Sequence, residues 1–253
     1  MALPSHGAEP HAFTVQQKVF LWLASISVTS LLVADILGVR LFKFPLPFSF
    51  HVPWQPDPIE AIQHTCGMLT FPITFLLTDL INEYYGKKAA RRVVWLGFAM
   101  GGISFLTINV ALGMPYWEAP FNVPEKSFSD IFANSRVMYV ASLAAYLVGN
   151  LCDVAMFVWI KRLTGPRYVW LRATGSTIVS QFIDSFIVTW LAFSVGRRLF
   201  PTDAQAMPFA EVLKTAATGY MLKFAIAIAS TPIIYAGRWF IHHWFGLKPL
   251  PPE

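Results

Sequence analysis

Charged and amide side chains interrupt segments of this chain that are otherwise apolar. The spacing of some of them places them on the same face of a helix. In the stretch FPITFLLTDLINEYYGKKAARR, Asp79 and Glu83 are four residues apart and share one helical face, with Asn82 beside them. Asp184 and Lys223 also lie inside apolar stretches. Carboxylates accept hydrogen bonds, whereas ammonium and amide groups donate them. These residues could therefore bind a polar molecule, carry a proton, or pair with one another.

Other polar residues lie in segments of the same kind, and all of them need partners. The remaining members of the set are Asp35, Asn150, Asp153, Ser176 and Gln181. A charged side chain at the centre of a bilayer costs at least about 2.5–3.5 kcal/mol, so such groups face the protein interior or a wet cavity. Several acids near one lysine cannot all be ionised cheaply. We expect at least one of these acids to be neutral or to change protonation during function.

The elements that must position these residues are membrane helices. Of the 253 residues, 55% are hydrophobic and 13% are charged, which disfavours soluble, disordered and nucleic-acid-binding classes. The sequence predicts an all-α integral membrane protein, a single domain over residues 1–253. Because a span needs about 20 mostly apolar residues, six spans are expected at 19–39, 66–85, 93–113, 137–160, 176–196 and 216–238. Segment 40–65, rich in Pro and aromatic residues, could form a hairpin or an interfacial segment.

The distribution of Lys and Arg predicts the orientation. These cations are more numerous in the loops on the side of the two termini than in the loops on the other side, and the cytoplasmic side of a membrane protein carries the excess. Both termini are therefore expected in the cytoplasm. The polar N-terminal segment lacks the apolar core of a signal peptide. The form of the chain favours a bacterial inner (cell) membrane.

The sequence contains no motif of a metal site or of a familiar enzyme. There is no His-Glu-x-x-His helix, no P-loop and no Gly-x-Ser-x-Gly elbow. We expect no metal, no cofactor and no nucleic-acid partner, and a small molecule and the lipid bilayer as partners. Three classes remain open: a carrier, a substrate-capture subunit energised by a separate ATPase module, and a small intramembrane enzyme.

Small residues at a spacing of four allow helices to approach closely. They are Gly97 and Gly101, then Ala141, Ala145 and Gly149, then Ala225 and Ala229. Two interpretations of this pattern remain open: the small residues could serve packing within one monomer, or they could form the interface of a homodimer.

Four ordered stretches carry a resemblance to a known family. They are TDLINEYYGKKAARR, ASLAAYLVGNLCDVAMFVWIKRLTG, WLRATGSTIVSQFIDSFIVTWLAF and GYMLKFAIAIASTPIIYAGRWF. The chain resembles the queuosine-precursor transporters, a branch of the vitamin-uptake transporter family. The resemblance implies import of a 7-deazaguanine base for tRNA modification, the candidates being 7-cyano-7-deazaguanine, 7-aminomethyl-7-deazaguanine and queuine. It also implies an architecture similar to that of the substrate subunits of energy-coupling-factor importers.

The resemblance also implies a site, and the chemistry of the base agrees with it. A 7-deazaguanine presents N1–H and a 2-amino group side by side, which one carboxylate can accept together, and its carbonyl oxygen needs a donor. We expect substrate contacts from Glu83, Asp184, Gln181, Asn82 and Asn150. Coupling or supporting roles are expected for Asp79, Asp153, Lys223, Asp35 and Ser176. Asp35 stands where the family pattern has Asn, Asn150 where it has Gln, and segment 40–65 is unlike the family's short connection.

Overall fold

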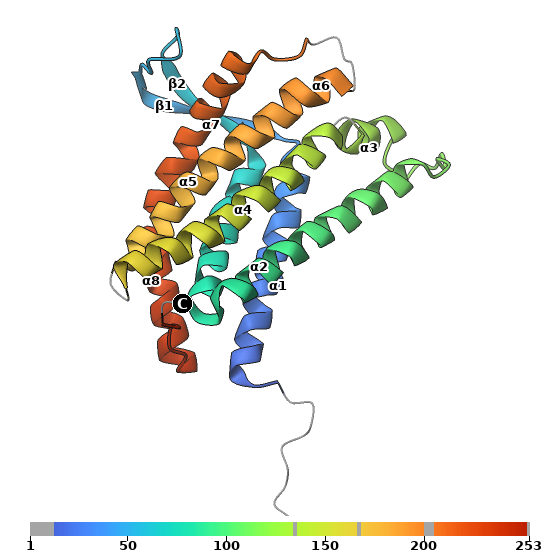
Figure 1. Ribbon diagram of the computed structural model, residues 1–253. Coiled ribbons are helices and arrows are strands. Elements are labelled where there is room, and N and C mark those ends of the chain that lie inside the picture. Colours follow the sequence, from blue (N-terminus) through green and yellow to red (C-terminus); the bar gives the residue numbers. More distant parts are fainter. Residues whose placement is uncertain (1–12, 134–135, 166–167, 200–204, 252–253) are drawn as a thin grey trace, which may run out of the picture.

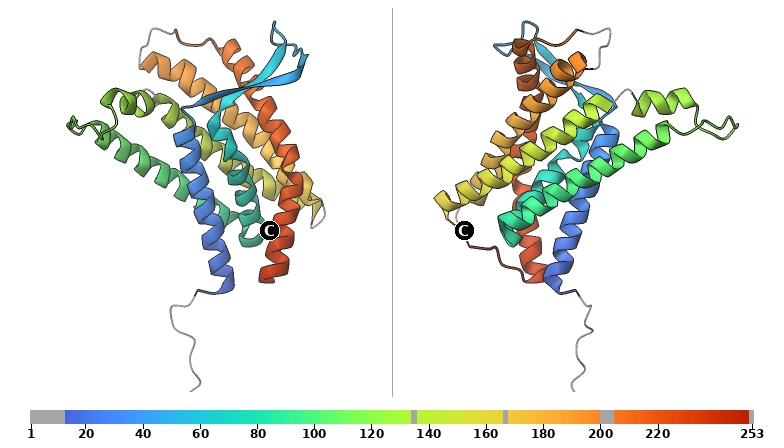
Figure 2. Two further views of the ribbon diagram at one scale, coloured as in Figure 1. Left: turned by 180° about the vertical axis from the view of Figure 1, so that it is seen from behind. Right: turned by 45° about the vertical axis from the view of Figure 1, so that its right-hand side comes forward.

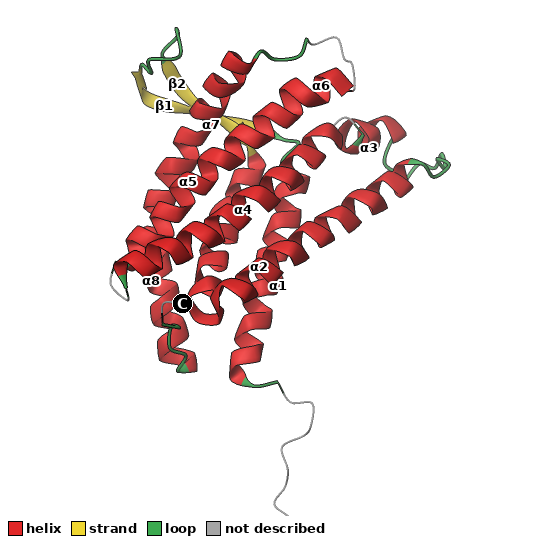
Figure 3. Ribbon diagram, in the orientation of Figure 1, coloured by secondary structure: helices red, strands yellow, loops and turns green. Residues whose placement is uncertain are grey.

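The computed structural model describes residues 13–133, 136–165, 168–199 and 205–251, and most of these residues are helical (Figure 3). The helices are α1 (Val15–Leu37), α2 (Phe71–Leu112), α3 (Glu125–Phe132), α4 (Arg136–Thr164), α5 (Val169–Trp190), α6 (Gly196–Leu199), α7 (Phe209–Ala229) and α8 (Thr231–Phe245). Two shorter helices are η1 (Cys66–Leu69) and the π-helical η2 (Leu191–Val195). Within the described residues, five helical stretches are long and apolar enough to cross a membrane. The predicted class, a helical membrane protein, is confirmed.

The helices run back and forth between two ends of the molecule. In Figures 1 and 2, α1 starts at one end and leads to a β-hairpin at the other. The chain then descends and rises again through α2, descends through α4, rises through α5, and descends through α7 and α8. The start of α1 and the C-terminal segment therefore lie at the same end. We call this the terminal end, and the opposite one the hairpin end.

Gly86 bends α2 sharply at the terminal end. Its backbone angles are φ 81° and ψ 172°, a conformation that is essentially restricted to glycine. The first arm of α2 descends to Gly86 and the second arm rises away from it (Figure 1). These arms correspond to the expected spans 66–85 and 93–113. Because the five candidate stretches include α2 as one helix, the number of six spans stays a prediction.

The expected span 216–238 does not coincide with one helix. The α7 helix ends at Ala229, Ser230 lies between, and α8 begins at Thr231 with Pro232 in its first turn. A proline has no backbone N–H and its ring clashes with the preceding turn, so it is favoured at a helix start rather than in the interior. The helices continue in the same direction and together make one descent (Figure 1).

Segment 40–65 forms the hairpin that was one of its two open interpretations. Strands β1 (Leu41–Phe50) and β2 (Ile59–Thr65) pair antiparallel, with Leu41 opposite Thr65. In the turn, the Trp54 indole N–H donates to the Thr218 hydroxyl of α7 at 3.3 Å. The hairpin is therefore attached to the helices both at its base and through its turn.

Buried apolar side chains concentrate around the bend of α2. The outer surface of the helices is apolar as well. One buried cluster joins α1, α2 and α4, and a second joins α2, α4, α5 and α8. Ile81 and Phe157, fully buried, belong to the first and the second cluster respectively. Large side chains such as Trp22 and Trp159 are more than half exposed. An exposed apolar surface on long helices is what a bilayer would cover.

Candidate functional site

A cavity of about 1300 Å³ extends from the hairpin into the helix bundle. Its walls come from α1, the β-hairpin, η1, the start of α2, and α4, α5 and α7. Four of the ten polar residues predicted for the site line this cavity: Asp35, Asn150, Asp184 and Lys223. The cavity therefore gathers residues that are far apart in sequence.

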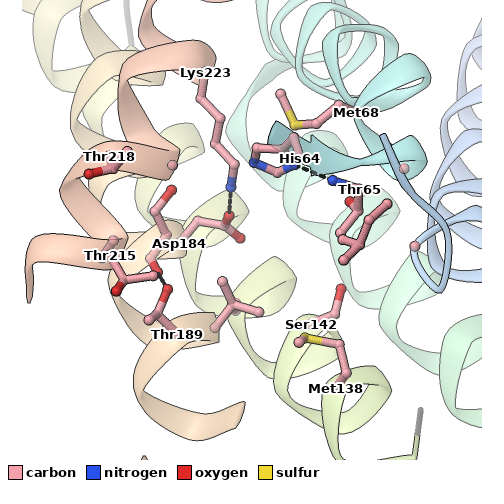
Figure 4. Close-up of a pocket in the computed structure, with 18 of the residues that line it drawn as sticks. His64, Thr65, Met68, Met138, Ser142, Asp184, Thr189, Thr215, Thr218 and Lys223 are labelled. Carbon is pink, nitrogen blue, oxygen red and sulfur yellow. Dashed lines mark hydrogen bonds and ion pairs between the residues drawn. The ribbon is translucent and has the colours of Figure 1, made fainter. Parts of the chain in front are cut away.

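An ion pair between α5 and α7 forms one wall of the cavity. The Lys223 ammonium donates to Oδ2 of Asp184, as Figure 4 shows. The side chains are 9% and 15% exposed, so the pair is largely buried but can be reached from the cavity. Both residues lie near the middle of their expected spans, so an ion pair between them was one possibility that the sequence left open, and the structure contains it. The pair adds no net charge to the wall.

His64 faces this ion pair from the end of strand β2, at the base of the hairpin. Its Nδ1 accepts a hydrogen bond from the backbone N–H of Thr65 at 2.9 Å, and its ring lies beside the Lys223 side chain (Figure 4). Burial, reinforced by the Lys223 charge, lowers the pKa of His64 to about 4. Its imidazole is therefore neutral at physiological pH.

Three buried polar atoms of the cavity wall lack a hydrogen-bond partner among the described residues. They are Oδ2 of Asp35, Oδ1 of Asn150 and Oγ of Ser185. The other atoms of the first two side chains are bonded, because Ser142 donates to Asp35 at 3.0 Å and Asn150 donates to a backbone carbonyl at 2.9 Å. Buried polar groups in folded proteins nearly always have a partner. Water or a polar ligand in the cavity could supply it.

Glu83 lies elsewhere, in an ion cluster at the terminal end. Its carboxylate pairs with Arg172 of α5, with Lys161 of α4 at 3.1 Å and with Arg238 of α8 at 3.6 Å. The backbone N–H of Leu250 also donates to the Glu83 carbonyl at 2.9 Å. Glu83 does not line the cavity. These ion pairs join α2 to α4, α5 and α8, and the expected contact of Glu83 with the ligand stays a prediction.

A layer of polar contacts lies between the cavity and this ion cluster along α2, α4 and α5. The Asp153 carboxylate accepts from Ser180 at 3.1 Å and from Thr177 at 3.4 Å, and it also contacts Ser176 and Asp79. The coupling or supporting roles expected for Asp79, Asp153 and Ser176 stay predictions.

Asn82 and Gln181 lie in the same buried layer and not on the cavity wall. Asn82 donates to the Val154 carbonyl at 3.2 Å, which ties α2 to α4. Gln181 is fully buried, and both of its amide atoms lack a partner among the described residues. Their expected contact with the ligand stays a prediction.

Sequence reasoning missed His64, Ser185 and the partners of Glu83. His64 comes just before the expected span 66–85, and Ser185 directly follows Asp184. Their proximity in sequence to a span and to a predicted site residue was the available signal that they could belong to the site. Arg172 lies between the expected spans 137–160 and 176–196 and would therefore be a loop residue, but apolar residues flank it in VWLRATGS, a pattern that indicates a buried partner. In the described part of the chain no group of three or more His, Cys, Asp or Glu could hold a metal ion.

Long apolar helices around a cavity with a neutral ion pair define a multi-pass membrane protein suited to binding a small polar molecule. A family model described as "Putative vitamin uptake transporter" matches residues 65–237, and the chain belongs to that family. It is therefore a membrane transporter with a small-molecule substrate.

Curated relatives agree with the family assignment. The chain is 33% identical over 176 residues to the "Probable queuosine precursor transporter" of Bacillus subtilis, a match that covers 69% of this chain and 71% of the relative. It is 31% identical to the protein of the same description in Haemophilus influenzae, over 58% of this chain and 54% of that one. It is 29% identical to the "Queuosine precursor transporter" of Escherichia coli, over 54% and 59%. No solved structure matches the chain.

Proposed function

We propose that this chain imports a queuosine precursor, a 7-deazaguanine base, and binds it in the cavity beside Asp184 and Lys223. The observation that carries this proposal is that one cavity is lined both by a buried ion pair and by buried polar atoms that lack a partner among the described residues. The names of the curated relatives support the choice of substrate.

The chemistry of the wall fits a neutral, flat base with a donor edge. The Asp184 carboxylate can accept N1–H and the 2-amino group together, and charge-assisted hydrogen bonds are roughly twice as strong as neutral ones. Because Lys223 already balances Asp184, a neutral ligand leaves no uncompensated charge at this ion pair. The amide oxygen of Asn150 and the free oxygen of Asp35 are acceptors for further N–H groups of the ligand.

We further propose transport without chemical change of the base, in a bacterial inner membrane with both termini in the cytoplasm. The cation-rich bend Lys87–Arg92 and the start of α1 lie at the same end of the molecule, which supports this orientation. The single domain and the homodimer remain predictions. Gly97, Gly101 and Gly149 approach side chains of their own chain, so these three glycines have a packing role that needs no second copy.

Uptake by the purified protein alone tests the proposal. Proteoliposomes that contain only this chain should accumulate a radiolabelled 7-deazaguanine base, and Asp184→Asn should abolish the accumulation. The matched control is His51→Ala, because His51 is exposed on the hairpin and does not line the cavity. Uptake that appears only after an ATPase module is added would contradict transport by the single chain and favour the capture-subunit class.

A further inference from the structure

One of the side chains that the hairpin contributes to the cavity is an imidazole. This side chain has no role in the substrate contacts proposed above. His64, the second-last residue of β2, lines the cavity together with Asp184 and Lys223. Figure 4 shows its imidazole between the Thr65 backbone and the Lys223 side chain. His64 is therefore close enough to share a ligand with the ion pair.

The hydrogen bond of one ring nitrogen determines what the other nitrogen can do. Because Nδ1 accepts from the Thr65 N–H, the proton of the neutral imidazole must be on Nε2. A neutral ring at physiological pH follows from burial and from the Lys223 charge. His64 thus presents a fixed N–H donor to the cavity.

Two donors meet on this part of the wall. The His64 Nε2–H and the Lys223 ammonium lie side by side, and two donors cannot satisfy each other. One ligand atom that accepts hydrogen bonds can take them from two neighbouring donors. On a 7-deazaguanine, the strongest such acceptor next to the N1–H edge is the carbonyl oxygen at C6.

We propose that His64 determines substrate specificity by donating a hydrogen bond to the C6 carbonyl oxygen of the base while Asp184 accepts from its N1–H edge. This inference rests on the proposed function, because it names a contact within that same cavity. It assigns the hairpin a part in substrate recognition.

The hairpin is held in a position that suits this role. Its base is fixed by the pairing of Leu41 with Thr65, and its turn by the hydrogen bond from Trp54 to Thr218 on α7. The family model begins to match at residue 65, so His64 lies just outside the part of the chain that the model covers. The contact would therefore come from a segment outside the matched family region.

The test compares one ligand change with one residue change. Calorimetry would measure the binding of 7-cyano-7-deazaguanine and of its 6-thio analogue, which keeps N1–H but has sulfur, a weaker acceptor, at the carbonyl position. The wild-type protein should prefer the oxygen compound by about fivefold to tenfold, the size of one neutral hydrogen bond. His64→Leu and His64→Ala should bind both compounds with nearly equal affinity, and His64→Gln, which keeps an N–H donor, should restore part of the preference.

The possible results of this experiment distinguish a failure of the His64 inference from a failure of the proposed function on which it rests. If the wild-type protein binds neither compound, both the proposed function and the role of His64 are wrong. If it binds the base and the variants without a donor keep the full preference for oxygen, His64 does not read the carbonyl, and only this inference is overturned. His51→Ala is the matched control on the same hairpin and should keep the wild-type preference, and thermal unfolding of each variant verifies that it is folded.

Discussion

At the scale of single residues, Glu83 and Asp184 show how neighbours decide the role of a buried acid. Both carboxylates are paired with cations, but among the described residues Asp184 has a single cationic partner, Lys223, and it lies on the cavity wall. Glu83 has three partners from three helices and is 2% exposed. We therefore expect Asp184 to meet the ligand, as proposed, and Glu83 to hold helices together.

The two acids should respond differently to the loss of their charge. Glu83→Gln leaves Lys161, Arg172 and Arg238 without the carboxylate that they surround, and breaking a buried pair costs about 3–5 kcal/mol of unfolding free energy. We expect a strongly lowered Tm and an unchanged Kd for the base in the protein that remains folded. Thermal unfolding and calorimetry on the same sample measure both quantities. A Glu83→Gln protein with normal Tm and no binding would place Glu83 in the ligand site instead.

The buried polar residues could be predicted from the sequence. Which of them contact one another could be predicted only in part. Asp79 and Glu83 share a helical face, as the spacing indicated, yet four residues of helix separate them by about 6 Å along the axis. That distance is enough to place Asp79 against Asp153 and Glu83 among cations. Depth along a helix decides the partner, and it depends on how neighbouring helices are staggered. The sequence does not give that stagger.

At the scale of elements, the bend at Gly86 sets the directions of the two arms of α2. Gly86→Ala should destabilise the protein by about 1–3 kcal/mol, because alanine is strained at φ 81° and ψ 172°. Gly102→Ala is the matched control in the same helix, since a methyl group there meets nothing within 4 Å. Thermal unfolding of both variants measures the difference. Equal Tm values would mean that the bend does not depend on glycine.

Gly149 allows α4 to approach α5 next to the ion pair. A methyl group at Gly149 would lie 3.1 Å from Cβ of Asp184, so Gly149→Ala should displace that carboxylate and weaken binding of the base about tenfold or more. Gly175→Ala is the control, because its methyl group would meet only the end of the Ile160 side chain, at 3.2 Å. Calorimetry compares the two Kd values. A Gly149→Ala protein that binds as tightly as the Gly175→Ala protein would show that helix approach does not position Asp184.

The helices could be predicted from apolar length, but their interruptions could only be predicted in part. Hydropathy located the helical segments because a bilayer demands long apolar runs. The π-helical stretch of η2 and the break at Ser230 were missed, since neither changes hydropathy. Segment 40–65 stayed ambiguous because its prolines exclude a regular helix without selecting a strand partner.

At the scale of the whole molecule, the cavity and the ion cluster give the two ends different properties. The cavity reaches the hairpin end, whereas the terminal end is closed by the Glu83 cluster and by Leu250, which bonds to Glu83. With both termini in the cytoplasm, as proposed, this structure is a state in which substrate enters from outside. Release into the cell then requires a second state in which the ion cluster opens.

Labelling of single introduced cysteines in whole cells tests which end of the molecule faces the outside of the cell. Thr215 of α7 is exposed on the cavity wall, so Thr215→Cys should react with a membrane-impermeant maleimide from outside and be protected by the base. Lys88→Cys, in the exposed bend at the terminal end, is the control and should react only after the membrane is permeabilised. The reverse pattern would mean that the orientation is inverted.

Binding of 7-deazaguanine bases to the purified protein, measured by calorimetry with guanine and riboflavin as controls, tests the central claim most directly. The account predicts saturable binding of at least one 7-deazaguanine base, its loss in Asp184→Asn, and its retention in the folded fraction of Glu83→Gln. Binding that survives Asp184→Asn unchanged, or the absence of binding for every 7-deazaguanine base, would contradict it.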